Sequence, residues 1–256
     1  MSRRDRLDAL VELSRSLGDP AAGWAILGEG NTSLRTGEDG FLVKASGLPL
    51  GDATRESFVE LRLEAVLALL DAPPAGDAEL AAALGACRLS DGPRPSVEAA
   101  LHAVCLTAGG AGAVGHTHPS AVNAILCSRT PEAVLAGPLF PDQIVVCGRH
   151  PLLVPYVDPG VPLALELRER LLRHAEEHSR PPKTVYLQNH GLIALGETTT
   201  EVLHVTQMAA KAARILLDSF ATGGPQPLPR EAAARIETRP DEHHRQQVLG
   251  LRRDRP

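Results

Sequence analysis

The stretch Ala113-Val114-Gly115-His116-Thr117-His118-Pro119 decides how the rest of the chain is arranged. It is predicted to form a buried strand that ends at a proline. Because side chains alternate between the two faces of a strand, His116 and His118 point to the same side. Two strand positions rise about 6–7 Å, so both imidazoles can converge on one ion beyond the strand end. The pair is a candidate metal site, and the alternative is a hydrogen-bonded polar patch without a metal.

The length and composition indicate an ordinary globular protein. The chain has 256 residues, of which 43% are hydrophobic and only 3% aromatic. This is enough for one large domain or two small ones, with a core filled by Leu, Val and Ala. The formal net charge is -5, and acidic and basic residues are interspersed. Nothing in this pattern indicates a nucleic-acid or membrane-surface partner.

The cysteines and the N-terminus bear on location. Cys87, Cys105, Cys127 and Cys147 show no Cys-x-x-Cys spacing, so we expect reduced, partly buried thiols rather than a disulfide framework. The basic N-terminus, residues 1–6, is followed by no apolar run, so no signal peptide or membrane span is expected. Both observations favour a cytoplasmic protein.

Hydrophobic periodicity predicts an α/β fold. Several predicted strands follow one another without a helix between them, which argues against a parallel doubly wound sheet and favours a mixed sheet covered by helices on both faces. Helices are expected over 5–17, 55–71, 77–84, from 96 onward, 120–128, 162–179, 199–220 and 229–238. Strands are expected over 41–47, 113–118, 143–147 and 152–156, and on both sides of residues 189–191.

Two turns are candidates for an anion pocket. Residues 28–35 and 41–47 each combine small residues with a strand, so backbone N–H groups can approach phosphate oxygens. Asn31, Ser33 and Ser46 add side-chain donors. The alternative, which these turns taken alone favour, is a pair of ordinary hairpin turns.

A helix is expected to open at Ser96, a good N-cap residue, with Glu98 in its first turn. The ordinary explanation of an acid there is the helix dipole. A catalytic base at this position would need burial or a neighbouring metal to set its basicity. His102 lies one turn further on, and its position favours a packed or hydrogen-bonded histidine over a metal ligand.

A second polar centre interrupts an apolar run. Asn189-His190-Gly191 separates two predicted strands, and a buried polar centre is costly unless its groups are satisfied. A metal ligand supported by an asparagine would satisfy it, and a turn histidine is the alternative.

Taken together, these motifs resemble the class II aldolase/adducin family over roughly residues 5–220. Within the family, the chain looks closest to the aldolase half of rhamnulose-phosphate aldolase/dehydrogenase fusions, and it is related to fuculose-phosphate aldolase. Each motif is weak alone, and five in order are specific. They are Gly30-Asn31-Thr32-Ser33, Lys44-Ala45-Ser46-Gly47, Pro95-Ser96-Val97-Glu98, His116-Thr117-His118-Pro119 and Asn189-His190-Gly191.

The resemblance implies a three-layer αβα sandwich with a mixed, mostly antiparallel sheet over residues 1–220, and a homotetramer. The tail over 221–256 begins with a segment rich in Pro, Gly and Gln and is expected to be peripheral. It implies Zn²⁺ as cofactor, with Mn²⁺ or Co²⁺ as suitable replacements. By resemblance the metal ligands are His116, His118 and His190, the catalytic acid/base is Glu98, and the phosphate site is formed by Asn31, Ser46, Gly47 and Ser96.

The implied activity is a metal-dependent lyase. It would cleave or form a carbon–carbon bond in a ketose phosphate or sugar-acid phosphate through a metal-stabilised enediolate. A second acid must serve the aldehyde oxygen, in the family often from a neighbouring subunit, and Asp142 and Tyr156 are candidates.

The resemblance leaves other functions open. An epimerase, decarboxylase or dehydratase on the same scaffold and a non-catalytic adducin-like binding module are the alternatives. The phosphate-binding aldolases have two serines before the glutamate, whereas here Val97 follows Ser96. The sugar therefore stays open, and Lys44 is a further candidate for holding its phosphate.

Overall fold

A seven-stranded sheet with β4 at its centre organises the structure, a computed structural model that describes residues 1–241 and Val248. The strand order is β3-β2-β1-β4-β7-β6-β5. Every neighbouring pair is antiparallel except β5 and β6. This confirms the predicted mixed, mostly antiparallel sheet. The strands are β1 Asn31–Arg35, β2 Gly40–Lys44, β3 Phe58–Arg62, β4 Ala113–Thr117, β5 Leu152–Val154, β6 Thr184–Leu187 and β7 Gly191–Gly196.

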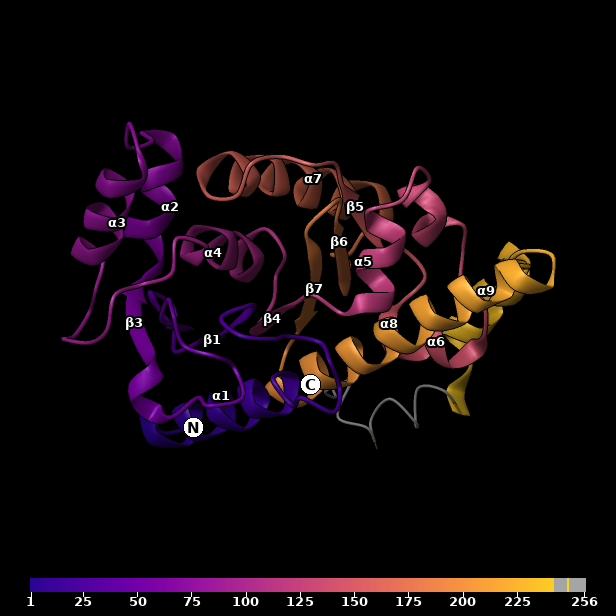
Figure 1. The fold of residues 1–256 in the computed structure, drawn as a ribbon, viewed down its shortest axis with the longest axis horizontal. Helices are drawn as coiled ribbons and strands as arrows, with labels where there is room; N and C mark the ends of the chain where they lie inside the picture. The colour runs from indigo at the N-terminus through magenta and orange to yellow at the C-terminus, as the bar shows by residue number, and fades with distance from the viewer. Residues whose placement is uncertain (242–247, 249–256) are drawn as a thin grey trace.

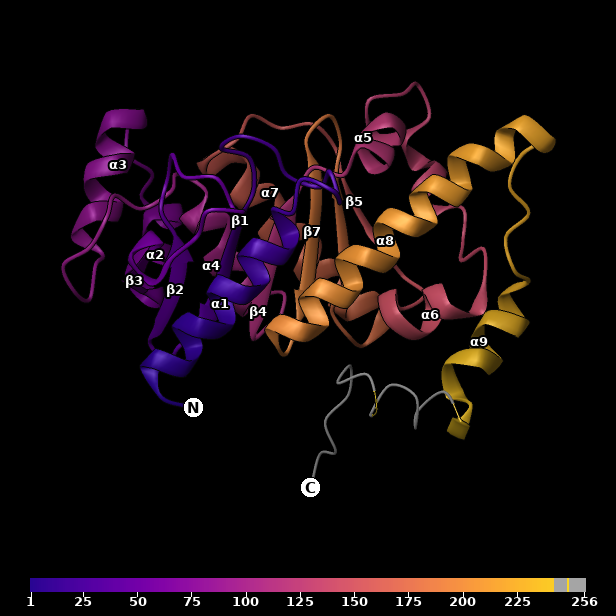
Figure 2. The same cartoon turned by 60° about the horizontal axis from the view of Figure 1, so that its bottom comes forward.

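Helices cover both faces of the sheet, so the three layers predicted are present (Figure 1). One hydrophobic cluster lies between the sheet and α2, α3, α4 and α7, and the other between the sheet and α1, α5 and α8. Figure 2 shows α1 and α8 side by side across the second face. The helices are α1 Arg3–Leu17, α2 Leu63–Asp71, α3 Asp77–Ala86, α4 Ala99–Thr107, α5 Ser120–Leu126, α6 Pro141–Cys147, α7 Val161–His178, α8 Thr199–Ser219 and α9 Arg230–Thr238.

Alternation along β4 places the His-x-His pair. Ala113 belongs to the cluster with α1 and α8, and Val114 to the cluster with α4 and α7. His116, two residues after Val114, is therefore on the α4 side of the sheet. Its backbone lies opposite Asn31 of β1 and Ile193 of β7, so it is flanked by a strand on each side.

The helix expected over 55–71 is wrong in its first half. Residues Arg55–Ser57 form a 3-10 turn and Phe58–Arg62 form β3, so that only Leu63–Asp71 is α-helical. The five residues of β3 pair with all five of β2 in antiparallel register. Phe58 and Val59 are both buried, on opposite faces of the strand, which a helical stripe does not account for. Pairing with a distant strand outweighed the local periodicity.

The strand expected over 143–147 is also wrong, because these residues form α6. Pro141 occupies the first helical turn, and Phe140 before it is extended. The four residues Ile144–Cys147 are all buried. A short run that is apolar on every side suits either a buried strand or an enclosed helix, and packing between α8 and α9 selects the helix.

The chain continues past residue 220 into an ordered helix, α9, as expected for 229–238. Ala233 and Ile236 pack against Ile144 and Val145 of α6. Glu237 pairs with both Arg149 and Arg180. The basic end of the chain lies outside the described residues, and a domain boundary at 220 stays a prediction.

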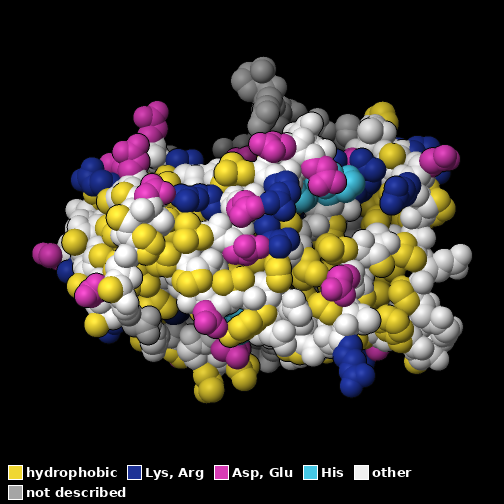
Figure 3. Space-filling view, turned by 90° about the horizontal axis from the view of Figure 1, so that it is seen from above, with side chains coloured by type: hydrophobic (Ala, Val, Ile, Leu, Met, Phe, Trp, Pro, Cys, Tyr) yellow, Lys and Arg dark blue, Asp and Glu magenta, His cyan; other side chains and the backbone are white. Residues whose placement is uncertain are grey.

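The surface and the thiols agree with the composition. The face formed by α2, α3 and α7 carries acidic and basic side chains side by side, with apolar ones gathered over its α2 and α3 end (Figure 3). The four cysteines are free, and three of them, Cys87, Cys105 and Cys147, are buried. Among the described helices, none has both the length and the apolar character that crossing a membrane requires.

Candidate metal centre

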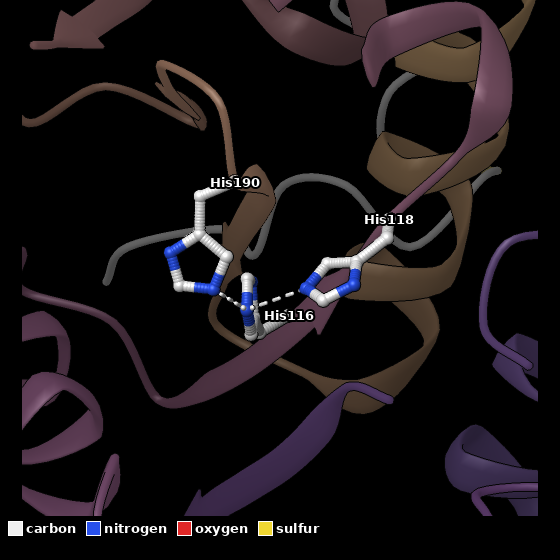
Figure 4. A group of neighbouring side chains, drawn as sticks. All are labelled: His116, His118 and His190. Atoms are coloured by element: carbon white, nitrogen blue, oxygen red, sulfur yellow. Dashed lines mark hydrogen bonds between the residues drawn. The ribbon is translucent and has the colours of Figure 1, made fainter. Parts of the chain in front are cut away.

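Three histidines converge at the end of β4 (Figure 4). His116 is on β4, His118 follows it directly, and His190 is in the turn between β6 and β7. The Nε2 atom of His116 lies 3.1 Å from that of His118 and 3.2 Å from that of His190. Within the described part of the chain, these three residues form the group able to offer ligand atoms within 4.8 Å of one another.

The donor set fits a divalent metal. With ligand bonds of about 2.0–2.1 Å, a tetrahedral zinc site holds its nitrogens about 3.3 Å apart, close to the spacing seen. Nδ1 of His116 lies 3.0 Å from the carbonyl oxygen of Leu192 and donates to it, which leaves the Nε2 lone pair directed into the group. Burial lowers the pKa of His116 to about 3 and also lowers the pKa of His118. His116 and His118 are therefore neutral, the form that binds metal.

Neighbouring groups hold two of the ligands in place. Oε1 of Glu29 lies 3.6 Å from Nδ1 of His118, on the ring edge away from the group, and the His118 backbone N–H donates to the carbonyl of Trp24. The side-chain amide of Asn123 donates to the His190 carbonyl at 3.1 Å. The Glu29 contact orients the His118 ring, and the other two bonds hold the backbone that carries His118 and His190. The Asn189 backbone adopts φ 55°, which completes the tight turn that presents His190.

Gly191 leaves room for the histidines, and adding one methyl group there should disrupt the site. A Cβ at this position would lie 2.5 Å from Cδ2 of His118 and 2.6 Å from the Thr117 carbonyl oxygen. We expect Gly191→Ala to lower metal affinity by about 10- to 100-fold, the cost of disturbing groups that orient a ligand. Metal titration of the purified variant measures this.

Gly115→Ala is the matched control. Its Cβ would meet Val202 and Leu17 on the opposite side of β4. It should therefore lower the melting temperature while leaving metal affinity unchanged. Equal metal affinity in Gly191→Ala and wild type would contradict the position assigned to the ligands.

Glu98 lies beside the histidines at the start of α4. Its Oε1 is 3.4 Å from Nε2 of His190 and 3.7 Å from Nε2 of His116. Burial alone would raise the pKa of Glu98, but contact with His116 and His190 outweighs it and holds the pKa below its usual range. The predicted N-cap, Ser96, is wrong: the helix begins at Ala99, so Glu98 occupies the N-cap position. Ser96 accepts from the Glu98 backbone N–H instead, at 3.3 Å.

The sequence did not predict the hydrogen bonds behind Glu98. The Asn31 amide nitrogen donates to Oε2 of Glu98, and the Asn31 side-chain oxygen bonds Nε2 of His102. Nδ1 of His102 lies 2.7 Å from the Ser33 hydroxyl. His102 is thus the hydrogen-bonded histidine expected, and the fully buried Ser33 uses its hydroxyl for the bond to His102. Two spacings in the sequence could have indicated these bonds: Glu98 and His102 are four apart at the start of a helix, and Asn31 and Ser33 are two apart on a strand.

Burial of His102 predicts that acid destabilises the metal-free protein. Burial lowers its pKa to about 4, with Glu98 opposing, whereas the unfolded chain has the ordinary 6.5. Neutral His102 therefore contributes stability that is complete above pH 6.5 and is lost as the pH falls toward 4. From about pH 7 to about pH 4.5, wild type should lose roughly 2–3 kcal/mol more unfolding free energy than His102→Gln. Urea titrations at both pH values measure it, and equal losses would contradict the assignment.

The residues expected to hold phosphate lie on two neighbouring segments. An isolated bridge pairs Ala45 with Pro95, and the Ser46 N–H bonds the Arg94 carbonyl, which brings the Ser46-Gly47 turn beside Ser96. Gly47 adopts φ 83°, as a tight turn requires.

The side chains of Lys44 and Asn31 are engaged elsewhere than at the Ser46-Gly47 turn. Lys44 is 1% exposed, its Nζ donates to the Ala45 carbonyl at 3.0 Å, and it shares the face of β2 with Leu42, on the α1 side. The Asn31 side chain contacts Glu98 and His102. Phosphate binding by all five residues stays a prediction.

Asp142 and Tyr156 occupy different places. Tyr156 follows β5, whose C-terminal end lies on the same side of the sheet as that of β4. The two strands are three positions apart in the sheet, which is about 14 Å at ordinary strand spacing. It is 55% exposed, and its hydroxyl donates to Asp158. Asp142 is in the first turn of α6, which Figure 2 shows toward the end of the strands opposite α5. Because α5 begins two residues after His118, the histidines lie at the α5 end of the strands, away from α6. Neither Asp142 nor Tyr156 therefore lies beside the three histidines of its own chain.

A mixed sheet lies between two helical layers, with three histidines and a carboxylate at the end of its central strand, so the protein is an α/β protein with a candidate metal site. The model of the class II aldolase and adducin N-terminal domain matches residues 8–217. The chain therefore belongs to the class II aldolase/adducin family, as its motifs predicted. No curated protein sequence matches the chain.

Solved structures agree with this assignment. The N-terminal class II aldolase domain of a conserved protein from Thermoplasma acidophilum is 25% identical, with a TM-score of 0.67, over 85% of this chain and 96% of that one. YgbL from Klebsiella pneumoniae, for which aldolase, epimerase or decarboxylase activity has been suggested, is 21% identical, with a TM-score of 0.71 over 92% and 99%. The L-fuculose-1-phosphate aldolase of Thermus thermophilus is 23% identical, with a TM-score of 0.60 over 88% and 100%.

Proposed function

We propose that the protein is a zinc-dependent lyase of the aldolase type that acts on a ketose phosphate or a related sugar-acid phosphate. The observation that carries this proposal is the convergence of His116, His118 and His190 with Glu98 beside them. Three neutral imidazoles hold a divalent ion and leave positions open for substrate oxygens. Manganese and cobalt suit the same nitrogens. Bound there, the ion supplies Lewis-acid stabilisation of negative charge on the substrate oxygens.

Glu98 has the position and charge of a base for the condensation direction. Ionised Glu98 takes a proton from the hydroxyl-bearing carbon beside the ketone, and the electron pair of that C–H bond moves toward the ketone oxygen to give an enediolate. The enediolate carbon then forms the new bond to the aldehyde carbon, and the aldehyde oxygen takes a proton from a second acid. Cleavage is the reverse, with Glu98 returning the proton to carbon.

A second copy of the chain is the proposed source of that second acid, through Tyr156 or Asp142. The support is that both side chains lie away from the histidines of their own chain, as described above. Ile26 and Leu27, in the loop that carries Glu29, are 58% and 82% exposed. Apolar side chains this exposed beside the site favour contact with another subunit. We propose a homotetramer in the cytoplasm, supported also by the free thiols.

The test is product analysis on a panel of ketose phosphates and sugar-acid phosphates with zinc-loaded protein. Release of an aldehyde together with a smaller ketone supports the lyase. An isomer of the substrate, carbon dioxide or loss of water assigns the reaction instead to an epimerase, a decarboxylase or a dehydratase. Failure to turn over any member, with metal bound, favours the non-catalytic adducin-like binding module. Omitting the phosphate from each active substrate decides whether the phosphate is recognised.

A further inference from the structure

The chain of side chains behind Glu98 crosses from strand β1 to helix α4 and is closed to solvent. Ser33 and His102 are fully buried, and Asn31 is 4% exposed. Each residue bonds the next, in the order Ser33, His102, Asn31 and Glu98. Since Ser33 and Asn31 are two apart on β1, and His102 is one turn after Glu98 on α4, both elements present their pair along one line.

Only one hydrogen-bond direction satisfies every member of this chain. The Asn31 amide nitrogen faces Oε2 of Glu98 and donates to it. The Asn31 oxygen then faces Nε2 of His102, which must carry a hydrogen. Burial keeps His102 neutral, so its Nδ1 has only a lone pair and must accept from the Ser33 hydroxyl. The orientation of the Asn31 amide therefore determines the tautomer of His102.

We propose that Ser33, His102 and Asn31 are positioning residues that fix the Glu98 carboxylate for catalysis. Asn31 holds Oε2, which leaves Oε1 directed at Nε2 of His190 and His116. His102 prevents the Asn31 amide from turning over, and Ser33 fixes the His102 tautomer. The inference rests on the proposed function, because it concerns how Glu98 is held for the proton transfer assigned to it there.

This arrangement also restricts what Asn31 can do toward a substrate. Its oxygen is taken by His102 and one amide hydrogen by Glu98, so a single amide hydrogen is left to donate to a ligand. Asn31 therefore links the predicted phosphate pocket to the position of the base.

The first test needs no substrate. Two-bond ¹H–¹⁵N correlation spectra of ¹⁵N-histidine-labelled protein at neutral pH report the tautomer of each ring, and loss of one set of signals in His102→Gln assigns His102. We expect the Nε2–H tautomer in wild type and a shifted Nδ1 signal in Ser33→Ala. An Nδ1–H tautomer or a doubly protonated ring would overturn the proposal, whether or not the protein proves to be a lyase.

The second test uses the substrate that the panel identifies. His102→Leu removes both ring bonds, and Asn31→Asp keeps the acceptor for His102 but removes the donor to Glu98. We expect both to lower kcat by about 10- to 100-fold with bound metal unchanged, the scale for misplacing a catalytic group. KM should stay unchanged in His102→Leu, which keeps the Asn31 amide. His102→Gln, which can still donate to Asn31, should recover most of the rate.

Val104→Ala separates positioning from stability. Val104 is fully buried on the same helix and belongs to the hydrophobic core, so its truncation destabilises α4 while leaving Ser33, His102, Asn31 and Glu98 themselves unchanged. It should keep the wild-type kcat. If His102→Leu lowers kcat no more than Val104→Ala, or if its whole effect is on KM, the positioning role is wrong.

Discussion

Replacing His190 by alanine should remove the metal from the protein. His190 supplies one of three nitrogens, and its Nε2 lies 3.2 Å from that of His116. Losing a ligand outright should cost more than the about 100-fold that loss of an outer contact costs. Protein purified without added metal should therefore contain about one zinc per chain in wild type, as one three-histidine site predicts, and almost none in the variant. Metal analysis by mass spectrometry measures both.

His178→Ala is the matched control, since it deletes an imidazole that stacks on His150 at the end of α7. It should retain the wild-type metal content. Metal that persists in His190→Ala would show that the third ligand is misassigned. No metal in either protein, and none taken up on reconstitution, would favour the binding-module alternative.

Replacing Glu98 by glutamine should abolish most turnover and leave the metal in place. Glutamine keeps the size and one oxygen for Asn31 but cannot take a proton at neutral pH. General acid–base catalysis contributes about 10²- to 10⁴-fold, so kcat should fall by that amount. The assay is turnover of the substrate found in the panel, with metal content measured on the same samples.

Glu60→Gln provides the comparison, because it removes a β3 carboxylate that pairs with Arg3 at the surface. It should leave kcat unchanged. Loss of metal in Glu98→Gln would show that Glu98 is itself a ligand, and unchanged turnover would remove it from the mechanism.

Local sequence patterns predicted most helices and strands. They failed at the segments whose structure is selected by contacts with residues distant in the sequence. The helix α1 and the strand at Ala113–Thr117 were predicted, because the hydrophobic periodicity of each stretch fits only one type of secondary structure. The helix over 55–71 failed at Phe58–Arg62, where apolar residues fit both periods until β2 pairs with them. Residues 143–147 failed because α8 and α9 enclose them, which no local signal shows.

The sequence by itself predicted the residue types of the candidate site. It placed two histidines on one face of a strand end, a carboxylate at a helix start and a histidine in a turn, because strand alternation and helix capping are local.

The motifs predicted by resemblance that His116, His118 and His190 belong together, but only the tertiary structure shows what brings them together and joins His102 to Glu98 through Asn31. The register that sets Thr117 opposite Leu192 puts the turn holding His190 beside His118, and packing of α4 on β1 joins His102 to Ser33. Strand register and helix packing are set by burial of the whole core, which short stretches of sequence do not encode.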